Sequence, residues 1–151
     1  MDLDITKSDI EKLIEIRRED KWLNHFLKFA TQDYRPTGEI GKAEIKIWKL
    51  NFWVGAFYPI FIFKLNTNNK LLSISSKLNS FGKSLFIFLF ILLISAFIKI
   101  DFAEMKLFGA VFIILLCTIF ISIFVLVTFK IYSFERKEQL KIIYKILSNN
   151  K

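Results

Sequence analysis

The residues that could do chemistry are few in this chain, and their spacing fits none of the common catalytic sites. The 151 residues include one histidine, His25, and one cysteine, Cys117. A histidine-based metal site would need carboxylates as its further ligands, and no such cluster is visible around His25. Cys117 has no neighbouring base in the sequence that would turn its thiol into a thiolate. We therefore expect neither a metal site nor a thiol nucleophile.

The carboxylates and glycines are equally uninformative about catalysis. The close acidic pairs, Asp2 with Asp4 and Glu19 with Asp20, lie among lysines and arginines, which is typical of a solvated surface. General acid–base catalysis therefore has no support. The five glycines are scattered, and none opens a helix after a strand as a phosphate-binding loop would. The sequence favours a protein that is not an enzyme and that holds no cofactor.

Two long apolar runs dominate the second half of the chain. The first extends over 84–98, and the second, 107–129, contains no ionisable group except the thiol of Cys117. As helices they would measure roughly 25 Å (counted to Ile100) and roughly 34 Å, and a hydrocarbon core is about 30 Å thick. These lengths predict a transmembrane hairpin of two spanning helices over 84–129, joined by the short loop 100–106.

The basic residues around this hairpin predict its orientation. Residues 36–83 carry seven basic and two acidic groups, and the tail from residue 130 carries six basic and two acidic. Basic residues next to a spanning helix tend to stay in the cytoplasm. The chain begins with acidic residues and has no signal-peptide core. We expect a multi-pass protein of the inner membrane with both termini cytoplasmic and basic residues at the membrane boundary: Lys83, Lys130, Arg136 and Lys137.

The remaining segments predict a small α+β region and a final amphipathic helix. Residues 1–35 form a helical region, in which 6–30 have the spacing of one or two helices, with a capping box expected at Ser8 and Glu11. Apolar and charged residues alternate over 43–48, which indicates a strand, and a turn at 67–69 joins two further strands, 60–65 and 71–75. In a competing interpretation of this last segment, one face of a helix that leads into the membrane is formed by Leu71, Ile74, Leu78 and Phe81. The predicted fold is thus an α-helical two-span membrane protein in four parts: helical 1–35, aromatic-rich and basic 36–83, the hairpin 84–129, and the basic amphipathic helix 130–151.

Two further segments allow alternative interpretations. The aromatic stretch 50–63 is too short to span a bilayer, and it could form a strand or lie on the membrane surface. The C-terminal helix could lie on an anionic leaflet or pack against the N-terminal region. Aromatic residues next to lysines could also stack on single-stranded nucleic acid. Beside a membrane hairpin we interpret them instead as interface anchors, and expect no direct nucleic-acid binding: Trp48, Trp53 and Tyr58.

Small and hydroxyl-bearing residues in the second apolar run suggest a packing surface. Thr118 and Ser122 are four residues apart, and Gly109 and Ala110 lie two to three turns earlier. Such residues allow close helix packing and interhelical hydrogen bonds. They could hold the two predicted spans together or join several copies into a homo-oligomer.

In architecture, the chain resembles the small two-span membrane effectors of bacterial anti-phage systems, of the retron-linked and cyclic-oligonucleotide-linked kinds. The resemblance depends on the 84–129 hairpin and the small aromatic-rich soluble part, and on no sequence motif. It implies a toxin that oligomerises in the lipid bilayer of the inner membrane when a protein regulator bound to residues 1–83 releases it. The alternative is a non-toxic membrane immunity protein, or an accessory subunit that anchors a partner.

Overall fold

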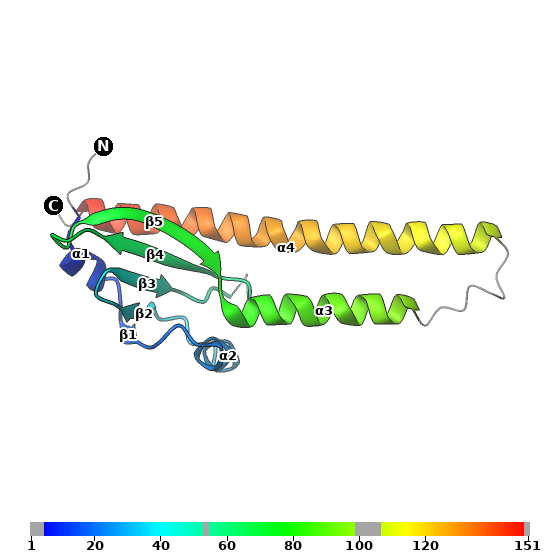
Figure 1. Ribbon diagram of the computed structural model, residues 1–151, viewed down its shortest axis with the longest axis horizontal. Coiled ribbons are helices and arrows are strands. Elements are labelled where there is room, and N and C mark those ends of the chain that lie inside the picture. The colour runs from blue at the N-terminus through cyan, green and yellow to red at the C-terminus, as the bar shows by residue number, and fades with distance from the viewer. Residues whose placement is uncertain (1–4, 53–54, 99–106, 150–151) are drawn as a thin grey trace.

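The protein consists of a sheet domain from which two helices extend side by side (Figure 1). The computed structural model describes residues 5–52, 55–98 and 107–149. Its elements, in chain order, are α1 (Lys7–Glu11), β1 (Ile16–Arg17), α2 (Trp22–Ala30), β2 (Thr37–Ile40), β3 (Glu44–Trp48), β4 (Pro59–Leu65), β5 (Leu71–Leu78), α3 (Ser80–Ile98) and α4 (Leu107–Asn149).

The five strands form one mixed sheet in the order of the chain, β1-β2-β3-β4-β5. β1 pairs parallel with β2, and all other neighbours are antiparallel. In β3 the apolar residues Ile45 and Ile47 alternate with charged ones, and they lie opposite Phe63 and Phe61 of β4. Because successive side chains of a strand point to opposite faces, this register gathers the apolar side chains on one face.

The turn between β4 and β5 is built by asparagines. The side-chain oxygen of Asn66 accepts hydrogen bonds from the backbone N–H groups of Asn68 (3.0 Å) and Lys70 (2.9 Å). Asn69 has a positive φ of 56°, a conformation that asparagine tolerates better than most residues. The hairpin predicted from the sequence over 60–75 is thereby confirmed, and β5 continues three residues further, to Leu78.

The C-terminal half of α4 closes the core of the sheet domain. Its buried residues Ile143 and Leu147 pack against the apolar face of the sheet and against α1. The C-terminal helix was predicted either to lie on an anionic leaflet or to pack against the N-terminal region. The structure shows the second arrangement, in which the helix is part of the core. The other members of this core are Ile5, Ile10, Ile45, Ile47, Phe61, Phe63 and Leu65.

The two-span fold class predicted from the sequence is wrong. Instead of a hairpin with a small soluble part, the chain forms a five-stranded sheet with helices, and among the described residues only Leu107–Ser148 is long and apolar enough to cross a membrane. Within α3, the apolar stretch Ser80–Ser95 is shorter than the same measure requires. The predicted amphipathic helix 130–151 continues the second apolar run without a break, as part of α4, and the predicted loop 100–106 lies outside the described residues.

The N-terminal region also differs in detail from its prediction. One or two helices were expected over 6–30, and the chain forms α1 and α2 with the short strand β1 between them. The capping box that begins α1 uses Thr6 and Asp9 in place of Ser8 and Glu11. The backbone N–H of Thr6 donates to the Asp9 carboxylate at 3.1 Å, which fixes the start of the helix beside the β4–β5 turn.

A tight contact seats α3 on the sheet domain. The buried Asn79 side chain donates to the carbonyls of Ala56 (2.7 Å) and Tyr58 (3.0 Å), and its oxygen accepts from the backbone N–H of Gly82 (2.7 Å). A Cβ atom on Gly82 would lie 2.5 Å from the Ala56 carbonyl oxygen. Only glycine lets α3 begin so close to the loop before β4.

We expect Gly82→Ala to lower the free energy of unfolding by about 2–3 kcal/mol, because the clash is with backbone and α3 must move away. Gly109→Ala is the matched control, because a Cβ atom there meets none of the described atoms within 4 Å. Chemical denaturation of both variants in detergent micelles measures the difference. Equal stabilities of the two variants would show that α3 is not held at Gly82.

Candidate functional site

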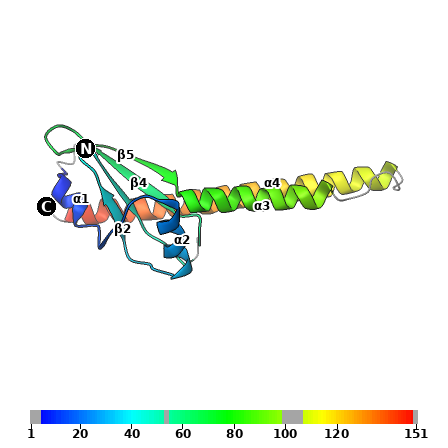
Figure 2. The ribbon, with the colours of Figure 1, turned by 60° about the horizontal axis from the view of Figure 1, so that its bottom comes forward.

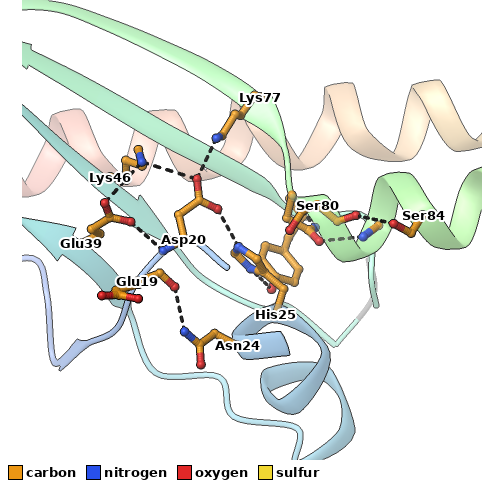
Figure 3. A network of polar contacts seen from close by, with 12 residues as sticks. Glu19, Asp20, Asn24, His25, Glu39, Lys46, Lys77, Ser80 and Ser84 are labelled. Carbon is orange, nitrogen blue, oxygen red and sulfur yellow. Dashed lines mark hydrogen bonds and ion pairs between the residues drawn. The ribbon is translucent and has the colours of Figure 1, made fainter. Parts of the chain in front are cut away.

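The most extensive polar network lies where α2 meets the polar face of the sheet (Figure 3). Its centre is Asp20, in the loop before α2, with a side chain only 6% exposed. One carboxylate oxygen accepts from His25 Nε2 (2.9 Å) and the other from Lys77 Nζ (2.7 Å). Lys46 Nζ approaches the second oxygen at 3.7 Å. The network joins α2, β3 and β5 through one carboxylate.

His25 continues the network into the protein interior. Its ring is fully buried beside Trp48, and its Nδ1 lies 2.8 Å from the hydroxyl of Tyr58. Burial lowers the pKa of His25 below its ordinary value, although the Asp20 carboxylate opposes this shift. The neutral ring then donates from Nε2 to Asp20 and accepts at Nδ1 from the Tyr58 hydroxyl.

The charges around Asp20 keep it ionised. Burial alone would raise the pKa of Asp20, but the hydrogen bonds from Lys77 and His25 outweigh it, and the pKa lies below its ordinary value. Glu39 completes the arrangement by accepting from the backbone N–H of Asp20 (2.6 Å) and from Lys46 (3.4 Å). Two carboxylates and two lysines thus balance one another at the edge of the network.

The order carboxylate, histidine, hydroxyl is that of a nucleophilic triad, but the exposure of the groups argues for a structural role. A triad needs a hydroxyl that reaches a substrate. The side chains of His25 and Tyr58 are both fully buried, and burial raises the pKa of Tyr58, which keeps its proton in place. We interpret the network as the connection that holds α2 on the sheet.

A second polar side chain of α2 is buried close by. Lys28 is 1% exposed, and its Nζ donates to the carbonyl of Arg35 (2.6 Å) and to Oγ1 of Thr37 (2.8 Å). Burial lowers the pKa of Lys28 from its ordinary 10.5 to about 8, partly offset by the charge of Asp33. These hydrogen bonds connect α2 to β2, although burial disfavours the charged form of Lys28.

The lowered pKa of Lys28 predicts a rise of stability with pH. Between pH 8 and 10.5 the unfolded chain binds more protons at this lysine than the folded chain, so the free energy of unfolding rises by about 2–3 kcal/mol over that range. Lys28→Met should lack this rise, whereas the exposed control Lys12→Met should keep it. Denaturation curves at several pH values measure the difference, and parallel profiles for both variants would contradict the assignment.

Polar contacts also connect α4 to the loop after β3. The buried Glu135 accepts from Nδ2 of Asn51 (3.1 and 3.2 Å) and from Nε2 of Gln139 (2.6 Å). Gln139 also donates to the carbonyl of Lys49 at 3.1 Å. These bonds lie about one to three turns after the apolar part of α4 ends, and they fix the sheet domain to the helix at that level.

Next to this contact, α4 and the sheet enclose a mainly apolar cavity of about 110 Å³, lined among others by Leu13, Ile47, Phe61 and Ile143. Ligand sites are usually several times larger, at about 300–1,000 Å³. Over residues 5–52, 55–98 and 107–149, no group of three or more His, Cys, Asp or Glu side chains could hold a metal ion. This cavity is therefore smaller than a usual cofactor site.

The predicted interface anchors divide into two groups. Trp48 and Tyr58 are buried in the domain, at 1% and 0% exposure, so their assignment as membrane anchors is wrong. They pack with Leu50 and Ile60 because β3 and β4 pair side by side. Trp53 lies outside the described residues. The four basic residues predicted at the boundary are exposed: Lys83, Lys130, Arg136 and Lys137.

The predicted packing residues of α4 do not bring helices together within the chain. The hydroxyls of Thr118 and Ser122 donate to carbonyls of their own helix, those of Ile114 and Thr118, at 2.8 Å each. Both side chains are exposed, while Gly109 and Ala110 are partly exposed. The contact between α3 and α4 includes instead Phe86 stacked on Phe124, with ring centroids 5.5 Å apart. Self-association through the hydroxyl residues stays a prediction.

Sequence reasoning missed the network around Asp20. The sequence shows no cluster of metal ligands around His25 and indicates a solvated surface for Asp20. Their spacing across the start of a helix is a usable signal, because a residue just before the first turn can reach one within it. Tyr58 and Lys77 lie more than thirty residues away, and only the strand pairing brings them to the same place.

Comparisons with protein-family models, curated proteins and solved structures find no match for this chain. The class of the protein therefore follows from its own geometry. It is a small mixed α/β domain built on the polar end of a long helix whose other end is apolar. That apolar helix could span a membrane, by its length and composition.

Proposed function

We propose that this protein is a membrane-anchored binding protein without catalytic activity, an accessory subunit that holds a protein partner at the surface of a bilayer. The observation that carries the proposal is the continuity of α4. The segment before Lys130 is apolar with an unburied surface, while Ile143 and Leu147, on the same helix, belong to the domain core. An unbroken helix transmits the orientation of its membrane segment to the domain.

The free side of β5 supports the binding of an extended protein segment. β5 is the last strand of the sheet, and within the described ranges no further strand pairs with it. Among the described residues, the chain near Ile5 covers the beginning of β5, where Leu71 N–H donates to the Ile5 carbonyl at 2.8 Å. Exposed strand edges accept a strand from a partner, and backbone hydrogen bonds supply the affinity.

The polar chemistry of the domain supports binding rather than catalysis. The histidine, the tyrosine and the carboxylate that could form a relay are buried in their own network. The groups at its margin are Lys46, Lys77 and Glu39, and Lys77, a residue of β5, is the most exposed of them at 42%. Amino groups next to an open strand edge favour a partner segment with acidic residues.

Membrane anchoring through α4 is tested by placing charges in its apolar part. Leu116→Lys with Ile119→Lys should move the full chain from the membrane fraction to the soluble fraction, because each lysine costs several kcal/mol in a bilayer. Leu72→Lys with Ser73→Lys, on exposed positions of β5, should leave the chain in the membrane fraction. Retention of the α4 variant in carbonate-washed membranes would contradict the anchor.

Partner binding is tested by photo-crosslinking from β5 in the native host. A crosslinker at Ser75 should give one protein adduct, and the adduct should disappear when β5 is blocked by a fused strand. A crosslinker at Lys12, an exposed lysine in the turn after α1, is the matched control and should give none. The same adducts from both positions, or none from Ser75, would contradict binding at β5.

The membrane-perturbing effector stays a prediction. Its proposed mechanism requires two spanning helices per chain, and multi-pass topology with cytoplasmic termini is not supported, since α4 alone among the described helices has the length. Membrane potential after expression separates the two functions. The anchor predicts no depolarisation, and depolarisation that depends on Thr118 and Ser122 would favour the effector.

A further inference from the structure

α2 buries its polar side and exposes its apolar side, the reverse of a helix on the surface of a soluble domain. Its two buried residues are the polar His25 and Lys28, both at 1% exposure or less. An amphipathic helix on a soluble domain normally buries its apolar stripe and exposes its polar side. Here the exposed side is apolar and aromatic, and consists of Trp22, Leu23, Phe26, Leu27 and Phe29.

The contacts of α2 explain the buried side but not the exposed one. His25 and Lys28 have hydrogen-bond partners on β2 and in the neighbouring loops, including Tyr58 just before β4, so the polar side is satisfied. On the apolar side, Leu23 is 57% and Leu27 41% exposed. A contiguous apolar patch of this kind marks a surface that contacts a partner or a membrane.

The position of α2 along α4 identifies the membrane as the partner. The stacked pair Phe86–Phe124 sets the level of α3 against α4, which run in opposite directions (Figure 1). Phe81 precedes Phe86 by five residues, and because the two helices are antiparallel it lies level with about Phe129, five residues after Phe124. The apolar part of α4 ends at this level. The rings of Trp22, Phe26 and Phe29 lie 5.6, 5.5 and 5.4 Å from that of Phe81.

The orientation of α2 agrees with this level. Figure 1 shows α2 end-on while α3 and α4 run across the view, and Figure 2 shows it lying crosswise to both. If α4 runs along the bilayer normal, α2 lies in the plane of the surface, as interfacial helices do. The exposed Lys83 and Lys130 lie at the same level and suit anionic headgroups.

We propose that α2 is a second membrane contact, an interfacial helix that places Leu23, Phe26 and Leu27 at the boundary between headgroups and acyl chains. The proposal rests on the anchoring of α4 in the same bilayer. Its consequence is a fixed tilt: with α4 crossing the surface and α2 lying in it, the domain keeps one inclination to the bilayer, and the edge of β5 keeps one orientation relative to the membrane surface.

The test measures the depth of fluorescent labels in vesicles of phosphatidylcholine with phosphatidylglycerol. The full chain carries Cys117→Ser and one new cysteine, at Leu23, Phe120 or Ser73, all of them exposed positions. Nitroxide lipids that quench near the surface should quench the label at Leu23 at least twofold more than lipids that quench deeply. The label at Phe120 should show the opposite order, and the label at Ser73 should be quenched by neither.

The three labels separate failure of this inference from failure of the anchor. A label at Leu23 that is as unquenched as the one at Ser73, while the label at Phe120 is quenched, would overturn the inference and leave the anchor intact. It would point to a second copy or another protein on the apolar side of α2. An unquenched label at Phe120 would contradict the anchor, and the inference would fail with it.

Discussion

Asp20→Ala is expected to lower the free energy of unfolding by about 3 kcal/mol. The substitution removes the acceptor of two hydrogen bonds, from His25 (2.9 Å) and Lys77 (2.7 Å), and leaves a buried ring N–H without a partner. An unsatisfied buried donor costs about 1–3 kcal/mol, and breaking a buried charge pair costs more. Loss of the network should also release α2, which hydrogen exchange of its amides would detect.

The matched control for this prediction is Glu19→Ala, one residue earlier. Glu19 pairs with Lys21 on the surface, where its side chain is 65% exposed, and we expect no measurable change. The pH dependence supplies a second check. Because the folded pKa of Asp20 lies below its ordinary value, the contribution of the carboxylate is complete above about pH 4 and is lost as the pH falls further. Equal losses in both variants would contradict the network.

Ile143→Ala is expected to cost about 3 kcal/mol, within the range of about 2–5 kcal/mol for large-to-small changes in a core. Ile143 is 8% exposed and packs against the sheet together with Leu147. Its removal should loosen the sheet domain from α4 without moving α4 out of the membrane. We expect faster proteolysis of the domain and unchanged membrane fractionation.

The neighbouring isoleucine provides the control for the core prediction. Ile142 is 56% exposed, and Ile142→Ala should cost less than about 1 kcal/mol. Urea denaturation in detergent micelles, followed by the near-ultraviolet signal of the buried Trp48, measures both variants. A loss for Ile142→Ala as large as that for Ile143→Ala would show that α4 packs on the sheet by a different face.

Local pattern was sufficient for those parts of the fold in which neighbours in sequence are neighbours in space. The alternation over 43–48 predicted β3, and the asparagine turn predicted the β4–β5 hairpin. The apolar run from Leu107 predicted the apolar part of α4. No residue breaks the helix where the pattern changes from apolar to amphipathic, so the sequence predicts that the C-terminal helix continues the apolar one, as it does in α4.

The prediction was wrong where long-range pairing decides the environment of a side chain. Trp48 and Tyr58 have the composition of an interface belt, but strand pairing places them in the interior. The apolar side of a helix normally faces the interior of a domain, whereas the partners that turn His25 and Lys28 inward exist only in the assembled sheet. The membrane contacts proposed here are therefore on α2 and not on the aromatic strands.

The continuity of α4 from the bilayer into the domain is tested most directly by spin labels placed one at a time along its exposed positions, from Phe108 to Ile146, in vesicles. We expect the labels before Lys130 to be accessible to oxygen, and the exposed labels after it to be accessible to a water-soluble relaxation reagent. The accessibility of the labels should follow one unbroken helical periodicity through this change. Accessibility to the water-soluble reagent along the whole of α4, or a loss of helical periodicity near Lys130, would contradict the continuity of α4.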